Sequence, residues 1–167
     1  MTYLRHSSRA VRKTVSDYIQ AEVAALGWTD PATTPFNAPV ADFITSIPRD
    51  YESWRQMEPG KVAITFGDEE NPAEEELGGP LHSFMLTTFV DVYMEKDAHA
   101  LTLASDIKDK LLGRDGGKRV HTVTDPATGL TVDDWQMEIY SVTMGRMEGF
   151  LAWYVITAMF EVRYHEA

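Results

Sequence analysis

The chain has 167 residues, of which 44% are hydrophobic and 25% charged, a composition typical of one globular domain and not of a disordered segment. It contains no cysteine, which excludes disulfides, zinc–thiolate sites and thiol catalysis. The formal net charge of −11 argues against general nucleic-acid binding, because phosphate contacts need clustered Lys and Arg.

The first predicted element is a helix that starts near Ser7 or Ser8 as the N-cap and continues to about Leu26, where Gly27 ends it. Arg5, Arg9, Arg12 and Lys13 crowd its first turns, where the helix dipole disfavours positive charge by about 0.3–1 kcal/mol. These side chains form either a solvated polar face or a contact patch for an acidic surface on another subunit, and the sequence leaves both interpretations open.

Residues 28–60 are predicted to form a long irregular arm, because five prolines interrupt the segment. The arm is too rich in large apolar side chains to be a free linker. We therefore expect it to pack along its own domain or along a neighbouring copy. A structureless connection of this length is unusual and tends to be functional. Its candidate interface residues are Trp28, Phe36, Phe43 and Trp54.

A short strand is predicted at Lys61–Phe66, ended by Gly67, and an acidic loop follows over residues 67–80. Six carboxylates fall within nine residues of this loop and are candidate interface residues: Asp68, Glu69, Glu70, Glu74, Glu75 and Glu76. Such a block repels itself, which favours a mobile, solvated loop between two antiparallel strands. Its spacing lacks the alternating carboxylates and turn glycine of a calcium loop, so we expect no metal there.

The central unit of the chain combines a strand from Phe84 to Met94 with a helix that follows directly. The strand places apolar residues at every second position, with Thr88 as the one polar gap. The helix shows an apolar stripe, with Asp97 expected as its cap and Gly113 as its left-handed end. The predicted stripe consists of Ala98, Leu101, Ala104, Ile107 and Leu111.

Three more strands are predicted at Arg119–Thr124, Asp134–Met144 and Phe150–Tyr164, separated by turns rich in Gly, Asp and Pro. The order of elements predicts a single α+β domain over residues 1–167. We expect a mostly antiparallel sheet of four to five strands, two main helices on one face, and the long arm.

No pattern of catalytic, cofactor-binding or metal-ligating residues emerges from the sequence. The five histidines are scattered, and neither a nucleophile elbow nor a phosphate-binding glycine loop is present. Asp91 on the central strand is the one carboxylate that invites inspection. The alternation of its neighbours favours a solvent-facing Asp over a catalytic base. We therefore expect no enzyme activity and no cofactor. No apolar run is long enough for a membrane span and no signal-peptide pattern is present, so we expect the protein to work inside a cell or to be assembled there.

The layout as a whole resembles the tail terminator proteins of long-tailed bacteriophages. The resemblance lies in the first helix, in the strand KVAITFG, and in the strand FMLTTFVDVYME that passes directly into the helix DAHALTLASDIKDKLL. It ends with the final strand WYVITAMFEVRYHE. The arm and the acidic loop are longer than the family pattern.

The resemblance implies a structural virion protein, assembled in the bacterial host cytoplasm and located at the head-proximal end of the tail. Its partners would be copies of itself in a ring, usually of six, the tail tube protein, and the connector of the head. The ring would end tube growth, and DNA would pass through it without specific binding. A neighbouring neck or tail-completion protein is the alternative, and a small-molecule-binding or enzymatic α+β domain is a more distant one.

Overall fold

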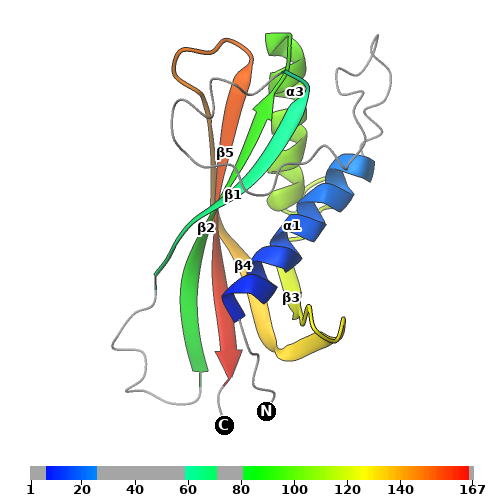
Figure 1. Cartoon of the computed structure of the whole chain (residues 1–167), viewed down its shortest axis with the longest axis vertical. Coiled ribbons are helices and arrows are strands. Elements are labelled where there is room, and N and C mark those ends of the chain that lie inside the picture. Colours follow the sequence, from blue (N-terminus) through cyan, green and yellow to red (C-terminus); the bar gives the residue numbers. More distant parts are fainter. Residues whose placement is uncertain (1–6, 26–58, 71–80, 166–167) are drawn as a thin grey trace.

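The computed structural model describes residues 7–25, 59–70 and 81–165, which form two helices on one face of a five-stranded sheet (Figure 1). The strand order is β1-β2-β5-β4-β3, and every neighbouring pair is antiparallel. The α+β fold predicted from the sequence is therefore confirmed. The helices are α1 (Ser7–Ala25) and α3 (Asp97–Leu111), and the strands are β1 (Lys61–Glu70), β2 (Leu81–Tyr93), β3 (Val120–Thr124), β4 (Thr131–Arg146) and β5 (Trp153–His165).

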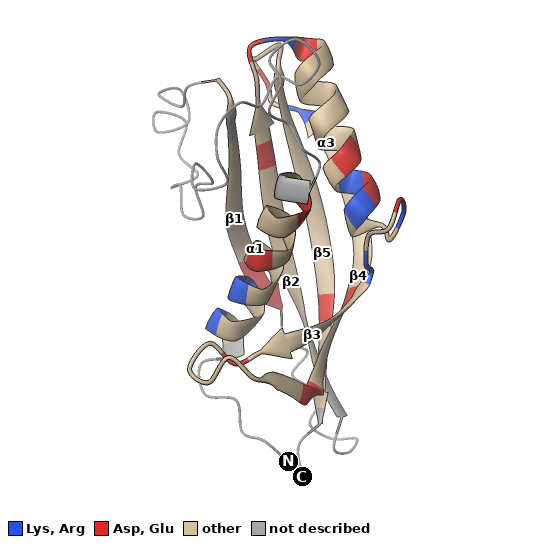
Figure 2. Cartoon of the chain, turned by 90° about the vertical axis from the view of Figure 1, so that its right-hand side faces the viewer, with Lys and Arg blue, Asp and Glu red and all other residues tan. Residues whose placement is uncertain are grey.

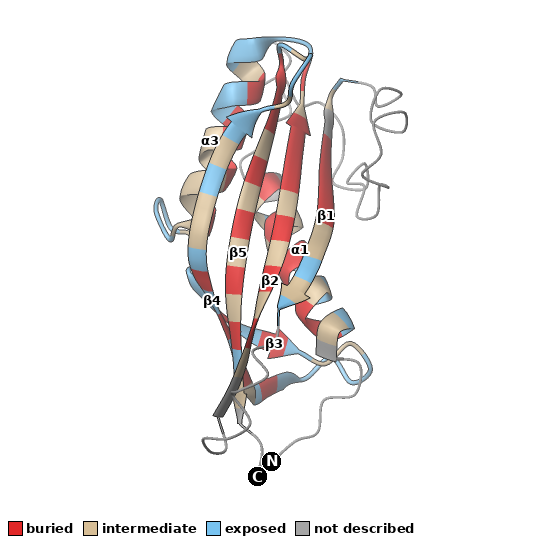
Figure 3. Cartoon of the chain, turned by 90° about the vertical axis from the view of Figure 1, so that its left-hand side faces the viewer, coloured by how far each residue is buried: buried red, intermediate tan, exposed pale blue. Residues whose placement is uncertain are grey.

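The core lies between the helices and the sheet face that β2 and β5 dominate. Alternate residues of both strands are buried there, as the period of two in the sequence predicted. Figure 3 shows the opposite face of the sheet, with both helices behind it. The central residues on the helix side are Phe84, Leu86, Val90 and Val92 of β2, and Tyr154, Ile156, Phe160 and Val162 of β5.

The buried stripe of α3 differs from the predicted one. Leu101 is 40% exposed and Ala98 is also exposed, whereas Ala100 and Leu103 are fully buried. Two overlapping apolar sets exist in this helix, and the sheet selects the set in which Leu103 lines up with Ile107 at a spacing of four residues. The sequence pattern alone did not distinguish the two sets.

The ends of α3 confirm one predicted cap and correct the other. Gly113 adopts a left-handed conformation with φ of 77°, as the sequence predicted for the end of this helix. Asp97 is not the N-cap. That position is Lys96, whose side chain makes no capping hydrogen bond, and the Asp97 carboxylate accepts hydrogen bonds from residues of β4 and β5 instead.

Two β-bulges change the strands that the sequence predicted. β1 does not end at Gly67 but continues through a register shift between Phe66 and Glu69. In β4 a second shift between Ile139 and Ser141 reverses the alternation, so Met144 packs against the core while Tyr140 is 67% exposed. β4 is also longer at both ends than predicted, and β5 begins at Trp153 instead of Phe150.

Among the described residues, neither helix is long and apolar enough to cross a membrane. Most of the predicted arm and the later part of the predicted acidic loop lie outside the described residues. The same is true of the candidate interface residues Trp28, Phe36, Phe43, Trp54, Glu74, Glu75 and Glu76.

Candidate assembly surfaces

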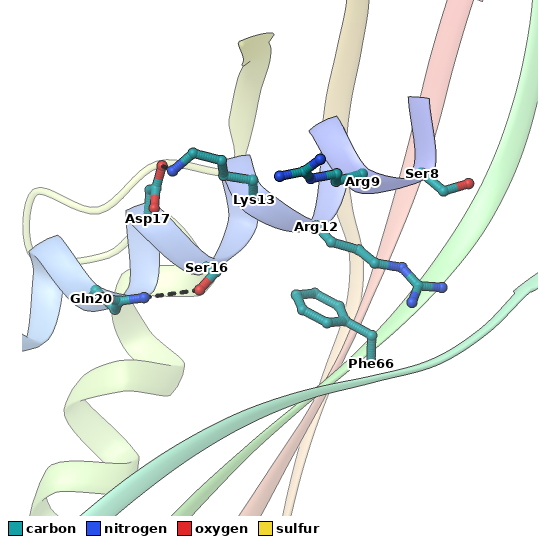
Figure 4. A pocket seen from close by; sticks show the side chains of 8 residues that line it. All are labelled: Ser8, Arg9, Arg12, Lys13, Ser16, Asp17, Gln20 and Phe66. Carbon is teal, nitrogen blue, oxygen red and sulfur yellow. Dashed lines mark hydrogen bonds and ion pairs between the residues drawn. The ribbon is translucent and has the colours of Figure 1, made fainter. Parts of the chain in front are cut away.

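The basic residues of α1 line an open groove of about 660 Å³ between this helix and β1 (Figure 4). Figure 2 marks basic residues in blue on the first turns of the helix. Lys13 forms an exposed ion pair with Asp17 at 2.8 Å, and Arg9 is exposed. The groove is lined by Ser8, Arg9, Arg12, Lys13, Ser16, Asp17, Gln20 and Phe66.

Arg12 and Glu69, both predicted to contact other molecules, meet within this chain. An Arg12 Nη and Glu69 Oε1 are 3.4 Å apart, and the hydroxyl of Ser8 donates to the other carboxylate oxygen of Glu69 at 2.8 Å. The guanidinium also lies over the ring of Phe66, 5.5 Å from its centroid. Glu69 is therefore fixed by α1 and does not belong to a mobile acidic loop.

The prediction of a mobile loop starting at Asp68 is thus wrong for its first three carboxylates. Asp68, Glu69 and Glu70 belong to β1, and Glu69 and Glu70 pair with Leu86 and Met85 of β2. The physical reason is the bulge after Phe66, which re-aims the strand so that Glu69 reaches the cations of α1. Asp68 and Glu70 are exposed and Glu69 is partly buried, so two of the three remain available to a partner.

Helix α1 contacts both outer strands of the sheet, β1 and β3. On the side opposite Glu69, the hydroxyl of Thr14 accepts a hydrogen bond from the backbone N–H of Thr124 in β3 at 3.1 Å. One helix thus contacts β1 through Glu69 and the end of β3 through the Thr124 N–H.

A cluster around Tyr18 holds the middle of α1 in place. The Tyr18 hydroxyl accepts a hydrogen bond from the backbone N–H of Lys118 at 2.7 Å and donates to the carbonyl of Lys110 at 3.3 Å. Its ring lies 4.3 Å from that of His121, whose Nε2 is 3.1 Å from the carbonyl of Lys118. Burial raises the pKa of Tyr18 and lowers the pKa of His121, so both side chains are held in their neutral forms.

Asp91 is fully buried, which corrects the prediction of a solvent-facing side chain. The indole N–H of Trp153 donates to its carboxylate at 3.1 Å. Trp153 is itself fully buried and stacks on Tyr93 with ring centroids 4.6 Å apart. The alternation of β2 was predicted correctly, but it could not show that aromatic side chains enclose this face near Asp91.

A polar cluster at the upper end of the sheet was missed from the sequence. Tyr154 donates to Asp97 at 2.8 Å, and Arg146 donates to both Asp97 and the Tyr154 hydroxyl at 3.1 and 2.9 Å. These contacts tie the start of α3 to β4 and β5. The three residues are far apart in the sequence, and no local signal connects them.

In the described part of the chain, no group of three His, Cys, Asp or Glu side chains could hold a metal ion. The expectations of no enzyme activity, no cofactor and no metal remain predictions. What these residues do offer is a groove with exposed cations and an exposed acidic strand end. Such features suit protein–protein contacts better than chemistry on a small molecule.

Comparison with known proteins finds similarity among solved structures but no matching family model or curated sequence. Among solved structures, a chain from the "Virion of native gene transfer agent (GTA) particle" has a TM-score of 0.46 and 12% sequence identity. The similarity covers 94% of this chain and 98% of that one.

Proposed function

We propose that this protein is a structural virion protein that caps the completed tail tube of a long-tailed phage as a ring, most simply of six copies. In this role it ends tube elongation and presents a surface to the head connector. The order of its elements is the observation that carries the proposal. A first helix, a strand, and a second strand that runs directly into a helix are followed by strands that end in β5, as the resemblance to tail terminators implies.

The surfaces of the described residues support an assembly role. A ring subunit needs separate contacts for its neighbours and for axial partners, and such interfaces are rich in aromatic and Met side chains. The chain contains 4 Trp, 7 Tyr, 7 Phe and 8 Met, and its net charge of −11 would keep a channel from retaining passing DNA. Exposed apolar side chains lie at separate places along the described chain, among them Leu130 before β4 and Leu151 before β5.

The test is the length of tail tubes. Tube protein is polymerised with and without this chain, and tube lengths are measured by electron microscopy. A terminator stops growth at the tube end and appears there as a ring. If tube lengths are unchanged but heads fail to join in its absence, the neck-protein alternative holds instead. If light scattering finds a strict monomer at every concentration and on added tubes, both assembly roles fail.

A further inference from the structure

We propose that, before assembly, two free copies of this chain pair through residues 142–146 of β4, the upper β4 edge. The contact has two-fold symmetry, and the occupant of the edge is the same segment of the second copy. This inference goes beyond the ring proposed above. A two-fold contact cannot join neighbours in a ring whose copies all face the same way, so it concerns the subunit in solution.

The upper β4 edge is open in the described part of the chain. β3 is the outermost strand on this side, but it pairs with β4 only as far as Glu138. One more hydrogen bond joins the Ile139 N–H to the Arg119 carbonyl at 2.9 Å. Above that point β4 is the outermost of the described strands (Figure 3). The side chains show that this segment is not covered: exposed are Thr143, Gly145 and Arg146, and half-buried are Val142 and Met144.

The backbone of the upper β4 edge offers unused hydrogen-bonding groups at alternate residues. In an antiparallel ladder, opposite residues alternately exchange two hydrogen bonds or none. The Met147 N–H donates to the Trp153 carbonyl at 2.8 Å, and the register continues without a shift from there to Ser141. The alternation therefore directs the N–H and C=O groups of three residues away from β5. These residues are Val142, Met144 and Arg146.

The three outward-pointing residues are symmetric about Met144. When two copies lie antiparallel with Met144 opposite the partner's Met144, Val142 of each copy lies opposite Arg146 of the other. Each of these three pairs can exchange two hydrogen bonds. The two-fold axis then stands perpendicular to the sheet, so the strands of both copies form one continuous sheet with all helices on the same face.

The helices leave room for this pairing. α3 packs mainly on β5. In the joined sheet the two β5 strands are three strand spacings apart, about 14 Å, whereas helices in contact lie about 8–10 Å apart. Leu101, which is 40% exposed, follows Asp97 by four residues and so lies on the side of α3 that contacts Arg146 of β4. Leu101 of each copy thus gains apolar cover above the paired Met144 side chains.

The two ends of the upper β4 edge carry opposite charges. Its lower end adjoins the exposed Arg119, whose carbonyl is bonded to Ile139, and its upper end continues to the exposed Glu148. Antiparallel pairing about Met144 brings Glu148 of each copy beside Tyr140, and hence beside Arg119, of the other. Two equivalent contacts of opposite charge favour this register over a shifted one.

The segment lacks the features that usually prevent strand pairing. It contains no proline, and its one charged side chain, Arg146, is held by Asp97 and Tyr154 at 3.1 and 2.9 Å. A contact of five residues on each strand is small for a specific interface. The dimer should therefore dissociate on dilution and give way to the larger contacts of an assembled particle.

A single engineered cysteine tests the contact, because the natural chain has no cysteine. In Met144→Cys the two thiols face each other across the two-fold axis, with Cα atoms about 5.5 Å apart, which suits a disulfide. Mild oxidation should give a covalent dimer and nothing larger on a non-reducing gel. The matched control is Val142→Cys, on the same edge and the same face. Its two Cα atoms lie about 14 Å apart along the paired strands, so it should stay monomeric. A folded Met144→Cys variant that stays monomeric, or equal cross-linking of both variants, would overturn the contact.

Charge reversal tests the register. Arg119→Glu alone and Glu148→Lys alone should each weaken dimerisation several-fold at low salt, measured by analytical ultracentrifugation, because each places like charges together twice. The double variant should restore it. If the double variant dimerises no better than the single ones, the antiparallel register about Met144 is wrong.

Hydrogen exchange on the unmodified protein needs no variant. The amides of Val142 and Met144 should exchange several-fold more slowly in a concentrated sample that is dimeric by light scattering than in a dilute one. Those of Thr143 and Gly145, which point toward β5, should change little. A sample that never dimerises, or equal exchange of Met144 in both states, overturns the contact even if a cysteine variant fails to fold. The measurement of tail-tube length does not depend on this edge, so either proposal can fail while the other stands.

Discussion

Replacing Thr88 with valine should make the protein more stable. Thr88 lies on the central strand β2, is fully buried, and its hydroxyl has no hydrogen-bond partner among the described residues. It faces the core under the helices, opposite Phe66 of β1 and Ala158 of β5. In the sequence, Thr88 is the one polar residue on an otherwise apolar face of this strand. In the structure, no hydrogen bond to a described residue compensates for the burial of its hydroxyl.

The expected gain is about 1–2 kcal/mol in the free energy of unfolding. Burying a hydroxyl without a partner costs about 1–3 kcal/mol, and valine has nearly the same shape and strand preference as threonine. For a chain of this size such a gain corresponds to an increase of roughly 2–8 °C in the melting temperature. Urea unfolding should show a higher midpoint with an unchanged slope.

The matched control is Thr14→Val in α1. The Thr14 hydroxyl donates to the carbonyl of Ala10 at 2.9 Å and accepts from the Thr124 N–H at 3.1 Å, so the same substitution should destabilise by about 1 kcal/mol. If Thr88→Val also lowers the midpoint, the Thr88 hydroxyl has a partner such as a buried water, and the reasoning fails.

Three further predictions concern the contacts around the sheet. Tyr18→Phe removes a hydroxyl that has two backbone partners and should lower the free energy of unfolding, measured in urea, by about 1–2 kcal/mol. An unchanged free energy of unfolding would mean that water replaces both hydrogen bonds and would contradict this prediction. Because burial lowers the pKa of His121, the unfolded chain binds more protons below pH 6.5, so stability should fall as the pH drops from 6.5 toward the folded-state pKa. His121→Gln should remove that part of the pH dependence, and an identical pH profile would contradict it. Trp153→Phe leaves the buried Asp91 with one donor fewer and should cost at least about 2 kcal/mol, whereas a neutral result would mean that this bond does not hold Asp91.

The fold could be predicted from the sequence because its strongest signals are local. The period of two in β2 and β5, the period near 3.6 in α1 and α3, and the glycine after α3 each specify an element without reference to distant residues. The errors arose where two local solutions were equally good. The apolar set of α3 that faces the sheet was one such choice, and the face of β4 beyond its bulge at Tyr140 was another.

The candidate surfaces could not be predicted to the same extent, since they depend on contacts between distant segments. Arg12 and Glu69 were both identified as charged residues available to partners, but a bulge in β1 brings them together within one chain. The burial of Asp91 could not be predicted without the position of Trp153 on the neighbouring strand β5, 62 residues away in the sequence. A charge pattern shows which residues can form an ion pair and leaves open whether the partner is internal.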